Sequence, residues 1–161
     1  MTSSLDSHLE NTINTDELVK MRDLVFSEYS KKSIFANIIL LPKSMHKLKR
    51  FKGEIGFAKK DFRPLKVELD IDILVVLEIF RHGAYRNFNN YVPISDPQGH
   101  VAGLLYAINL NTNEYIQYLE FNERVQPSSE WDDYPHYPSI TTSYYQAVEN
   151  VKKMIVDTFN I

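Results

Sequence analysis

The 161-residue sequence contains no cysteine, only five glycines, and no apolar run long enough to cross a membrane. The absence of cysteine excludes disulfide scaffolds, thiolate metal sites and cysteine nucleophiles. A membrane-spanning helix needs roughly 18 or more consecutive apolar residues, so we expect no membrane partner. The first ten residues have neither a basic start nor an apolar stretch, which predicts a cytoplasmic protein without a secretory signal.

The sequence also lacks the common signatures of catalysis. Its five histidines show none of the spacings that place two ring nitrogens on one metal ion. It contains neither a Gly-x-Ser-x-Gly nucleophile motif nor a glycine-rich phosphate loop. We therefore assign no catalytic residue, no metal ligand and no cofactor, and expect a protein that is not an enzyme.

Length and composition are those of one globular domain. Hydrophobic residues make up 43% of the chain and charged residues 24%, which is typical of a soluble protein with one core. Residues 1–14 are polar and without a regular pattern, so a flexible N-terminus is predicted. Residues 15–161 are expected to form a single α+β domain.

Two amphipathic helices are predicted, one near each end of the chain. The first starts at Thr15, which is followed by two acidic residues suited to a first turn, and ends near Ser30. The second starts close to residues 139–143, which supply several possible caps, and Ser143 with Gln146 has the spacing of a capping box. Its apolar stripe consists of Tyr144, Val148, Val151, Ile155 and Phe159.

Short apolar or alternating segments between these helices predict strands. Residues 34–41 form an apolar run that Pro42 ends, and residues 67–73 alternate strictly between apolar and acidic. The strand continues through residues 74–80, which are apolar apart from Glu78, and Gly83 permits a turn after it.

Two further strand regions follow. Residues 84–94 are rich in tyrosine, phenylalanine and valine, and residues 104–110 and 115–121 alternate on either side of a turn, which predicts a hairpin. The expected fold is therefore α+β, with one mainly antiparallel meander sheet and the N- and C-terminal helices packed against it.

Charge is divided sharply along the chain. Residues 43–66 contain nine basic and two acidic side chains, a net charge of +7, whereas the rest contains nine basic and nineteen acidic ones, a net charge of −10. Such a division predicts two opposed surfaces or a basic segment laid against acidic strands.

An acidic and aromatic loop lies between Pro127 and Pro138. Its prolines remove backbone donors and disfavour the helical region, so neither a helix nor a central strand can run through it. Large aromatic side chains lose little rotamer freedom on binding, and carboxylates steer a basic partner. The predicted partner-binding residues are Glu120, Glu123, Glu130, Trp131, Asp132, Asp133, Tyr134 and Tyr137. Alternatively, Trp131 only closes the end of the sheet with its ring in the margin of the core.

The segments from Gly103 to Phe121, the loop around Trp131 and the helix to Phe159 together resemble immunity proteins of bacterial contact-dependent or polymorphic toxin systems. The resemblance implies a stoichiometric inhibitor that binds one cognate toxin domain, often a basic nuclease, and blocks its active site or substrate path. Such a protein has no turnover of its own. The oligomeric state is not indicated.

A metal-dependent enzyme is one alternative. Asp70 and Asp72 are predicted on one strand face, which resembles the strand that holds magnesium in the nucleotidyltransferase superfamily and implies phosphoryl transfer. The Gly-Ser pair of that family is missing, since Glu54 follows Gly53 and Phe57 follows Gly56. The simpler interpretation is the polar face of an amphipathic strand, paired with the basic segment.

A nucleic-acid module is the other alternative. In segment 43–66, Lys47, Lys49, Arg50 and Lys52 lie near Phe51, and such sites combine phosphate neutralisation with aromatic stacking. The isoelectric point near 5.9 lacks the basic footprint of a whole nucleic-acid-binding domain, so nucleic acid is not the expected partner. A strand edge protected by lysines is the competing explanation.

Overall fold

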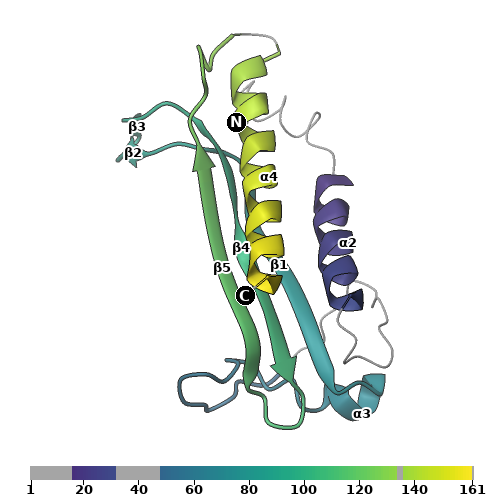
Figure 1. The fold of residues 1–161 in the computed structure, drawn as a ribbon. Coiled ribbons are helices and arrows are strands. Elements are labelled where there is room, and N and C mark those ends of the chain that lie inside the picture. Colours follow the sequence, from purple (N-terminus) through teal and green to yellow (C-terminus); the bar gives the residue numbers. More distant parts are fainter. Residues whose placement is uncertain (1–15, 32–47, 134–135, 161) are drawn as a thin grey trace. The chain divides into compact units, whose positions relative to one another are not determined.

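The computed structural model describes residues 16–31, 48–133 and 136–160. It shows an α+β fold with one three-stranded antiparallel sheet, in the order β1-β4-β5, packed against the N- and C-terminal helices, which confirms the predicted fold class (Figure 1). The long strands are β1 (Ile73–Tyr85), β4 (Gln98–Asn109) and β5 (Tyr115–Val125). The other elements are α2 (Asp16–Ser30), α3 (Leu65–Leu69), β2 (Phe88–Asn89), β3 (Val92–Pro93) and α4 (Pro138–Phe159).

The chain forms two compact units. Of the described residues, unit 1 contains 16–31, 79–103, 121–133 and 136–160, and unit 2 contains 48–78 and 104–120. The long strands contribute residues to both units, so the single domain expected from the sequence stays a prediction. The predicted flexible segment 1–14 and strand 34–41 lie outside the described residues.

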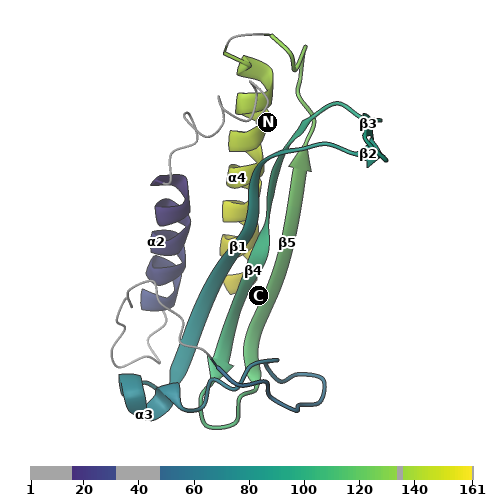
Figure 2. The same cartoon turned by 180° about the vertical axis from the view of Figure 1, so that it is seen from behind.

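In unit 1, α2 and α4 lie on the same face of the sheet (Figures 1 and 2). The predicted first helix is confirmed as α2, where Met21, Val25 and Tyr29 are buried at helical spacing. Edge-to-face packing of Tyr29 on Phe159, with ring centroids 4.9 Å apart, joins α2 to α4.

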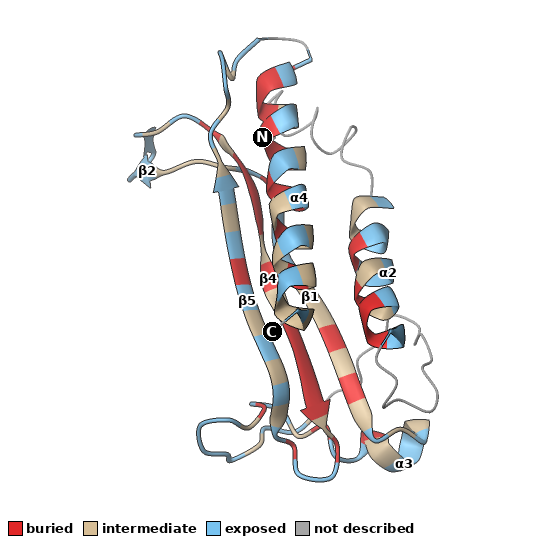
Figure 3. Ribbon diagram, viewed as in Figure 1, coloured by how far each residue is buried: buried red, intermediate tan, exposed pale blue. Residues whose placement is uncertain are grey.

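The second helix is confirmed close to residues 139–143, but the predicted capping box at Ser143 is wrong. α4 begins at Pro138, five residues before Ser143, because proline is suited to the first helical position. Ser143 caps nothing: its hydroxyl donates to the Ile140 carbonyl at 2.8 Å and accepts the Gly99 N–H at 3.1 Å. One side of α4 is buried and the other exposed (Figure 3), and the buried side includes the predicted Tyr144, Val148, Val151 and Ile155.

The predicted strand at residues 67–73 is wrong. Residues 65–69 form the short helix α3, which Pro64 precedes at φ −59°, and Asp70 ends it in the left-handed region at φ 53°. β1 therefore starts only at Ile73 and then continues through Gly83 to Tyr85, so the predicted turn at Gly83 is also wrong. The alternation over residues 67–73 suggested a strand, but a short helix also places apolar residues on one face. In α3, Leu65 is buried and Leu69, four residues later, is half-buried.

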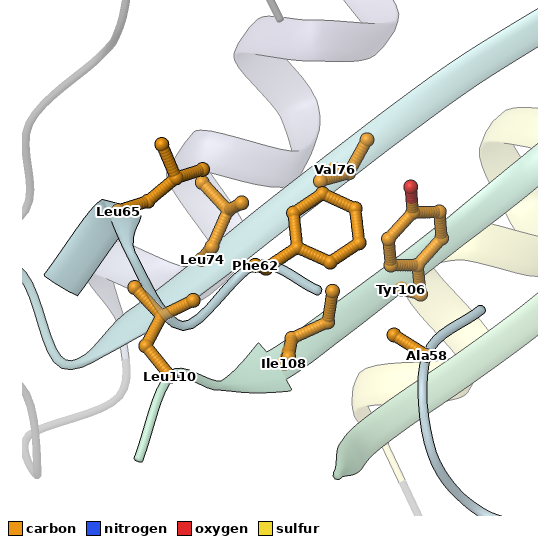
Figure 4. Packing of buried hydrophobic residues seen from close by; sticks show 8 residues of the cluster. All are labelled: Ala58, Phe62, Leu65, Leu74, Val76, Tyr106, Ile108 and Leu110. Atoms are coloured by element: carbon orange, nitrogen blue, oxygen red, sulfur yellow. The ribbon is translucent and has the colours of Figure 1, made fainter. Parts of the chain in front are cut away.

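Unit 2 has its own apolar core (Figure 4). Its buried members are Ala58, Phe62, Leu65, Leu74, Val76, Tyr106, Ile108 and Leu110. The β4–β5 hairpin was predicted correctly, and its turn carries the buried Asn113 at φ 67°. The Asn113 amide accepts the Phe62 N–H at 3.0 Å and donates to the Lys60 carbonyl at 3.0 Å, which fixes the preceding loop to the hairpin.

Candidate protein-binding site at Trp131

A pocket of about 600 Å³ lies in unit 1, beside the predicted acidic loop. Its lining residues are Asp96, Gln126, Pro127, Ser129, Glu130, Trp131 and Asp132. They come from two places in the sequence, the turn before β4 and the segment after β5. The predicted acidic loop therefore forms one wall of a pocket.

Trp131 is half-buried, so its side chain partly closes the core and partly lines the pocket. Its indole packs against the buried pair Tyr137 and Ile140, so part of the ring closes the core as the simpler interpretation expected. The guanidinium of Arg86 lies 4.8 Å from the centroid of the ring, close enough for a cation–π contact. The rest of the residue lines the pocket.

The loop is held by bonds to the start of α4. The Ser139 hydroxyl accepts the Ser129 N–H at 3.0 Å, and the Tyr137 N–H donates to the Asp133 carbonyl at 2.9 Å. Tyr137 itself adopts the left-handed region at φ 44° directly before Pro138. These contacts replace a regular ladder and preorganise the wall of the pocket.

The electrostatic character of the pocket is negative. Asp96, Glu130 and Asp132 are all exposed, and none forms an ion pair with the part of the chain that the structure describes. Among the residues that the structure describes, no group of three or more histidine, aspartate or glutamate side chains could hold a metal ion. Three exposed carboxylates without an ion-pair partner among the described residues favour a cationic group, such as a lysine or arginine side chain.

A second exposed feature is the β2–β3 hairpin, which ends three residues before the pocket residue Asp96. Its strands pair Phe88 with Pro93 and Asn89 with Val92. Large apolar side chains on it are solvent-exposed: Phe88 is 56%, Tyr91 97%, Val92 64% and Ile94 64% exposed. No residue from Asn87 to Ser95 carries a charge. Clustered exposed apolar side chains of this kind mark interaction surfaces.

Arg86 connects the hairpin to the pocket. Its Nε donates to the Ser95 carbonyl at 2.7 Å, closing the base of the hairpin, while its guanidinium stacks on Trp131. Asp96, the next residue after Ser95, lines the pocket. Hairpin and pocket are therefore parts of one surface of unit 1, which we call the Trp131 surface.

The structure places the predicted site residues unevenly. Glu130, Trp131 and Asp132 line the pocket, and Asp133 is exposed beside them. Tyr137 is only 4% exposed, so the prediction that its ring faces a partner is wrong: the ring packs against Trp131 and Ile140 instead.

The remaining predicted residues are not part of the pocket. The carboxylate of Glu123 accepts the Asn150 side-chain amide at 3.4 Å and so faces α4. Glu120 is exposed but belongs to unit 2, and Tyr134 lies outside the described residues. Sequence reasoning missed Asp96 and the hairpin, because residues 84–94 were predicted as one strand region, whereas the structure divides them between the end of β1 and the short strands β2 and β3. The uncharged run Asn87–Ser95 was a signal for the exposed hairpin.

The alternative aspartate site is not assembled as predicted. Asp70 ends α3 in the left-handed region, and Asp72 precedes β1, so the two do not share a strand face. Asp72 instead lies 3.5 Å from the Lys66 ammonium, as the pairing with the basic segment had suggested. The arrangement required for two-aspartate magnesium binding is therefore lost.

Comparisons with known proteins give no match: no family model fits the chain, and no curated protein or solved structure is significantly similar to it. Among the described helices, none combines the length and apolar character needed to traverse a bilayer.

Proposed function

We propose that this protein is a protein-binding inhibitor, an immunity protein that neutralises a cognate toxin domain through the Trp131 surface. The observation that carries the proposal is the combination of an acidic pocket at Trp131 with an exposed, uncharged apolar hairpin joined to it by Arg86. The immunity role follows from the resemblance in sequence pattern described above.

The two halves of the surface have different tasks in this proposal. The carboxylates of Asp96, Glu130 and Asp132 attract a basic partner and raise the association rate. The exposed rings and aliphatic groups of the hairpin then lose their contact with water, which slows dissociation. An inhibitor of this kind needs complementarity and no chemical step.

The partner that fits is a basic domain with an apolar groove. A lysine or arginine side chain of that domain would enter the pocket, where its charge meets the three carboxylates. A nuclease domain has such a basic surface because it must hold the phosphates of its substrate. Occupying that surface would exclude the substrate.

The test first looks for a toxin reading frame immediately upstream of this gene, whose absence counts against the immunity role, and then measures binding of the encoded toxin domain by isothermal titration calorimetry. Replacing Trp131 and Asp132 together by alanine is expected to weaken binding at least a hundredfold, because central aromatic and charged contacts dominate such interfaces. Asp157→Ala, which removes an exposed acid toward the far end of α4, serves as the control and leaves affinity unchanged.

Several results would contradict the proposal. If the wild-type protein does not bind the neighbouring toxin domain or protect its substrate, the immunity role is wrong. If binding occurs and the double variant binds as tightly as the wild type while keeping its circular dichroism spectrum, the Trp131 surface is not the interface.

A further inference from the structure

Unit 2 carries a concentrated positive surface on the loop 49–60, which we call the basic loop. Five exposed cationic side chains lie on it: Lys49, Arg50, Lys52, Lys59 and Lys60. None of the five forms an ion pair with any described residue. By contrast, the next two bases are compensated, since Arg63 binds Asp61 at 2.9 Å and Lys66 lies 3.5 Å from Asp72. The one acid within the loop is Glu54.

The backbone brings like charges together. Arg50 and Lys60 are direct partners in an antiparallel bridge, so their side chains emerge on the same face. The Phe51 N–H donates to the Lys59 carbonyl at 2.8 Å, and the Asp61 N–H donates to the Lys49 carbonyl at 2.8 Å, which fixes this register. Like charges directly opposite each other destabilise a strand pair, so folding alone gives no reason for this placement.

The loop is anchored firmly enough to present these charges in a fixed arrangement. The Ala58 N–H donates to the Asn113 carbonyl at 3.0 Å, and the Tyr115 N–H donates to the Gly56 carbonyl at 2.8 Å. The Asn113 side chain adds a bond to the Lys60 carbonyl. An anionic partner would therefore find preorganised cations and relieve the repulsion between Arg50 and Lys60.

We propose that the basic loop binds the phosphate backbone of a nucleic-acid duplex. A cluster of bases without ion-pair partners among the described residues is the electrostatic footprint of phosphate binding. The cluster lies on a chain whose overall net charge is −3, so the net positive charge is confined to segment 43–66, which contains this loop. The proposal does not rest on the inhibitor function, because the residues that carry it belong to unit 2 and those of the Trp131 surface to unit 1.

A duplex fits better than a single strand. Single-strand sites offer aromatic rings on which unpaired bases stack. The aromatic ring nearest the bases is Phe51, but it is half-buried, stacks on Phe57 with centroids 5.6 Å apart, and has the Arg63 guanidinium 5.1 Å from its centroid. No face of this ring is presented as a platform, so recognition would be directed to the backbone of paired strands.

The experiment measures fluorescence anisotropy of a labelled 20-base-pair DNA duplex of mixed sequence with the full chain at 50 to 200 mM salt. If all five cations contact phosphates, the slope of log affinity against log salt is about −4.5, equivalent to about a 500-fold loss over this range. The variant Arg50→Gln/Lys59→Gln/Lys60→Gln should lower affinity at 50 mM salt at least tenfold and reduce the steepness of the slope by about 2.7.

A matched variant controls for net charge. Arg22→Gln/Arg81→Gln/Lys153→Gln removes the same charge from exposed positions of unit 1 and is expected to change duplex affinity less than twofold. The basic-loop assignment is overturned if this control weakens binding as much as the loop variant, or if the wild type does not bind the duplex at 50 mM salt.

Parallel titrations identify the class of anion. An RNA duplex of the same sequence distinguishes the two kinds of duplex, and binding to either supports the proposal. Tighter binding to the corresponding single strand, to phosphatidylserine vesicles or to polyglutamate would overturn it, because the loop would then recognise another anion. Retention of the wild-type unfolding temperature in both variants excludes loss of folding as the cause.

Discussion

The hydroxyl of Tyr106 on β4 donates a 2.9 Å hydrogen bond to the carboxylate of Glu78 on the neighbouring strand β1, within unit 2. Burial, followed by this hydrogen bond, raises the pKa of Tyr106, so the phenol remains a donor at all ordinary pH values. Tyr144 on α4 is also buried, yet its hydroxyl has no partner in the described part of the chain. The two buried tyrosines therefore differ in whether the hydroxyl has a hydrogen-bond partner.

The same substitution should have opposite effects at these two positions. Tyr106→Phe leaves the Glu78 carboxylate without its donor and is expected to lower the free energy of unfolding by about 1–2 kcal/mol. Tyr144→Phe removes an unsatisfied buried hydroxyl and should raise that free energy by about 1 kcal/mol. Urea unfolding followed by circular dichroism measures both, and a loss of stability at Tyr144 would show that its hydroxyl is satisfied in solution.

A close approach of β4 to α4 predicts that Gly99 is essential for folding. A Cβ atom at this position would lie 2.3 Å from the backbone of Ser143 and Tyr144, and neither element can move without losing its packing. Gly99→Ala is therefore expected to cost about 3 kcal/mol or more. Ser143→Ala, which removes the acceptor of the Gly99 N–H but adds no atom, should cost only about 1–2 kcal/mol. Equal unfolding midpoints for the two variants would contradict the steric argument.

Asn113 is expected to be the most sensitive polar residue of unit 2. Its side chain satisfies the Phe62 N–H and the Lys60 carbonyl, and its φ of 67° strains most side chains. Asn113→Gly keeps the backbone conformation and loses the side-chain bonds, so a loss of about 2–3 kcal/mol is predicted. Asn113→Ala should lose about 1 kcal/mol more because alanine also disfavours the left-handed region. If alanine is tolerated as well as glycine, the left-handed conformation does not persist in solution.

Stability at low pH should depend on Glu17. Hydrogen bonds from Lys152 and then Lys20 lower the pKa of Glu17 below its ordinary value of 4.5. Because the folded pKa is the lower one, the contribution is present above the ordinary pKa and is lost as pH falls through the folded value. Glu17→Gln is expected to lower the free energy of unfolding by about 1 kcal/mol at pH 7 and to have no effect well below pH 4.

A matched control exists for this pair. Glu149 also binds Lys152 at 3.0 Å, but its side chain is 62% exposed whereas that of Glu17 is 15% exposed. Glu149→Gln should therefore change stability by less than about 0.5 kcal/mol, since solvent screens exposed pairs. Thermal unfolding of both variants between pH 3 and pH 7 makes the comparison. A pH-independent difference between Glu17→Gln and the wild type would show that the carboxylate charge is not responsible.

Much of the fold was predictable because its signals are local. The helical spacing of Met21, Val25 and Tyr29 predicted α2, and the alternation on both sides of Asn113 predicted the β4–β5 hairpin. The failure at residues 67–73 arose because alternation over seven residues is compatible with a short helix followed by a turn. The contacts of Leu65 and Leu69 with the core of unit 2 favour the helix.

The candidate site was predictable in part. Prolines and acidic residues indicated a loop around Trp131 whose backbone could not form regular structure. Asp96 was not connected with that loop, because it lies 35 positions earlier and reaches the pocket only through the folding of β4 and β5. Tyr137 had the same composition signal as Trp131, but packing against Ile140 buries it.

The sequence by itself determined the class of fold, the two amphipathic helices, the central hairpin and the division of charge, since each of these depends on residues close together in the chain. Tertiary structure decided which aromatic rings of the loop remain accessible, which carboxylates share a pocket, and which lysines lie opposite each other. Those properties depend on contacts between distant segments. Burial and the pairing of charges are set by such contacts, and composition alone does not specify them.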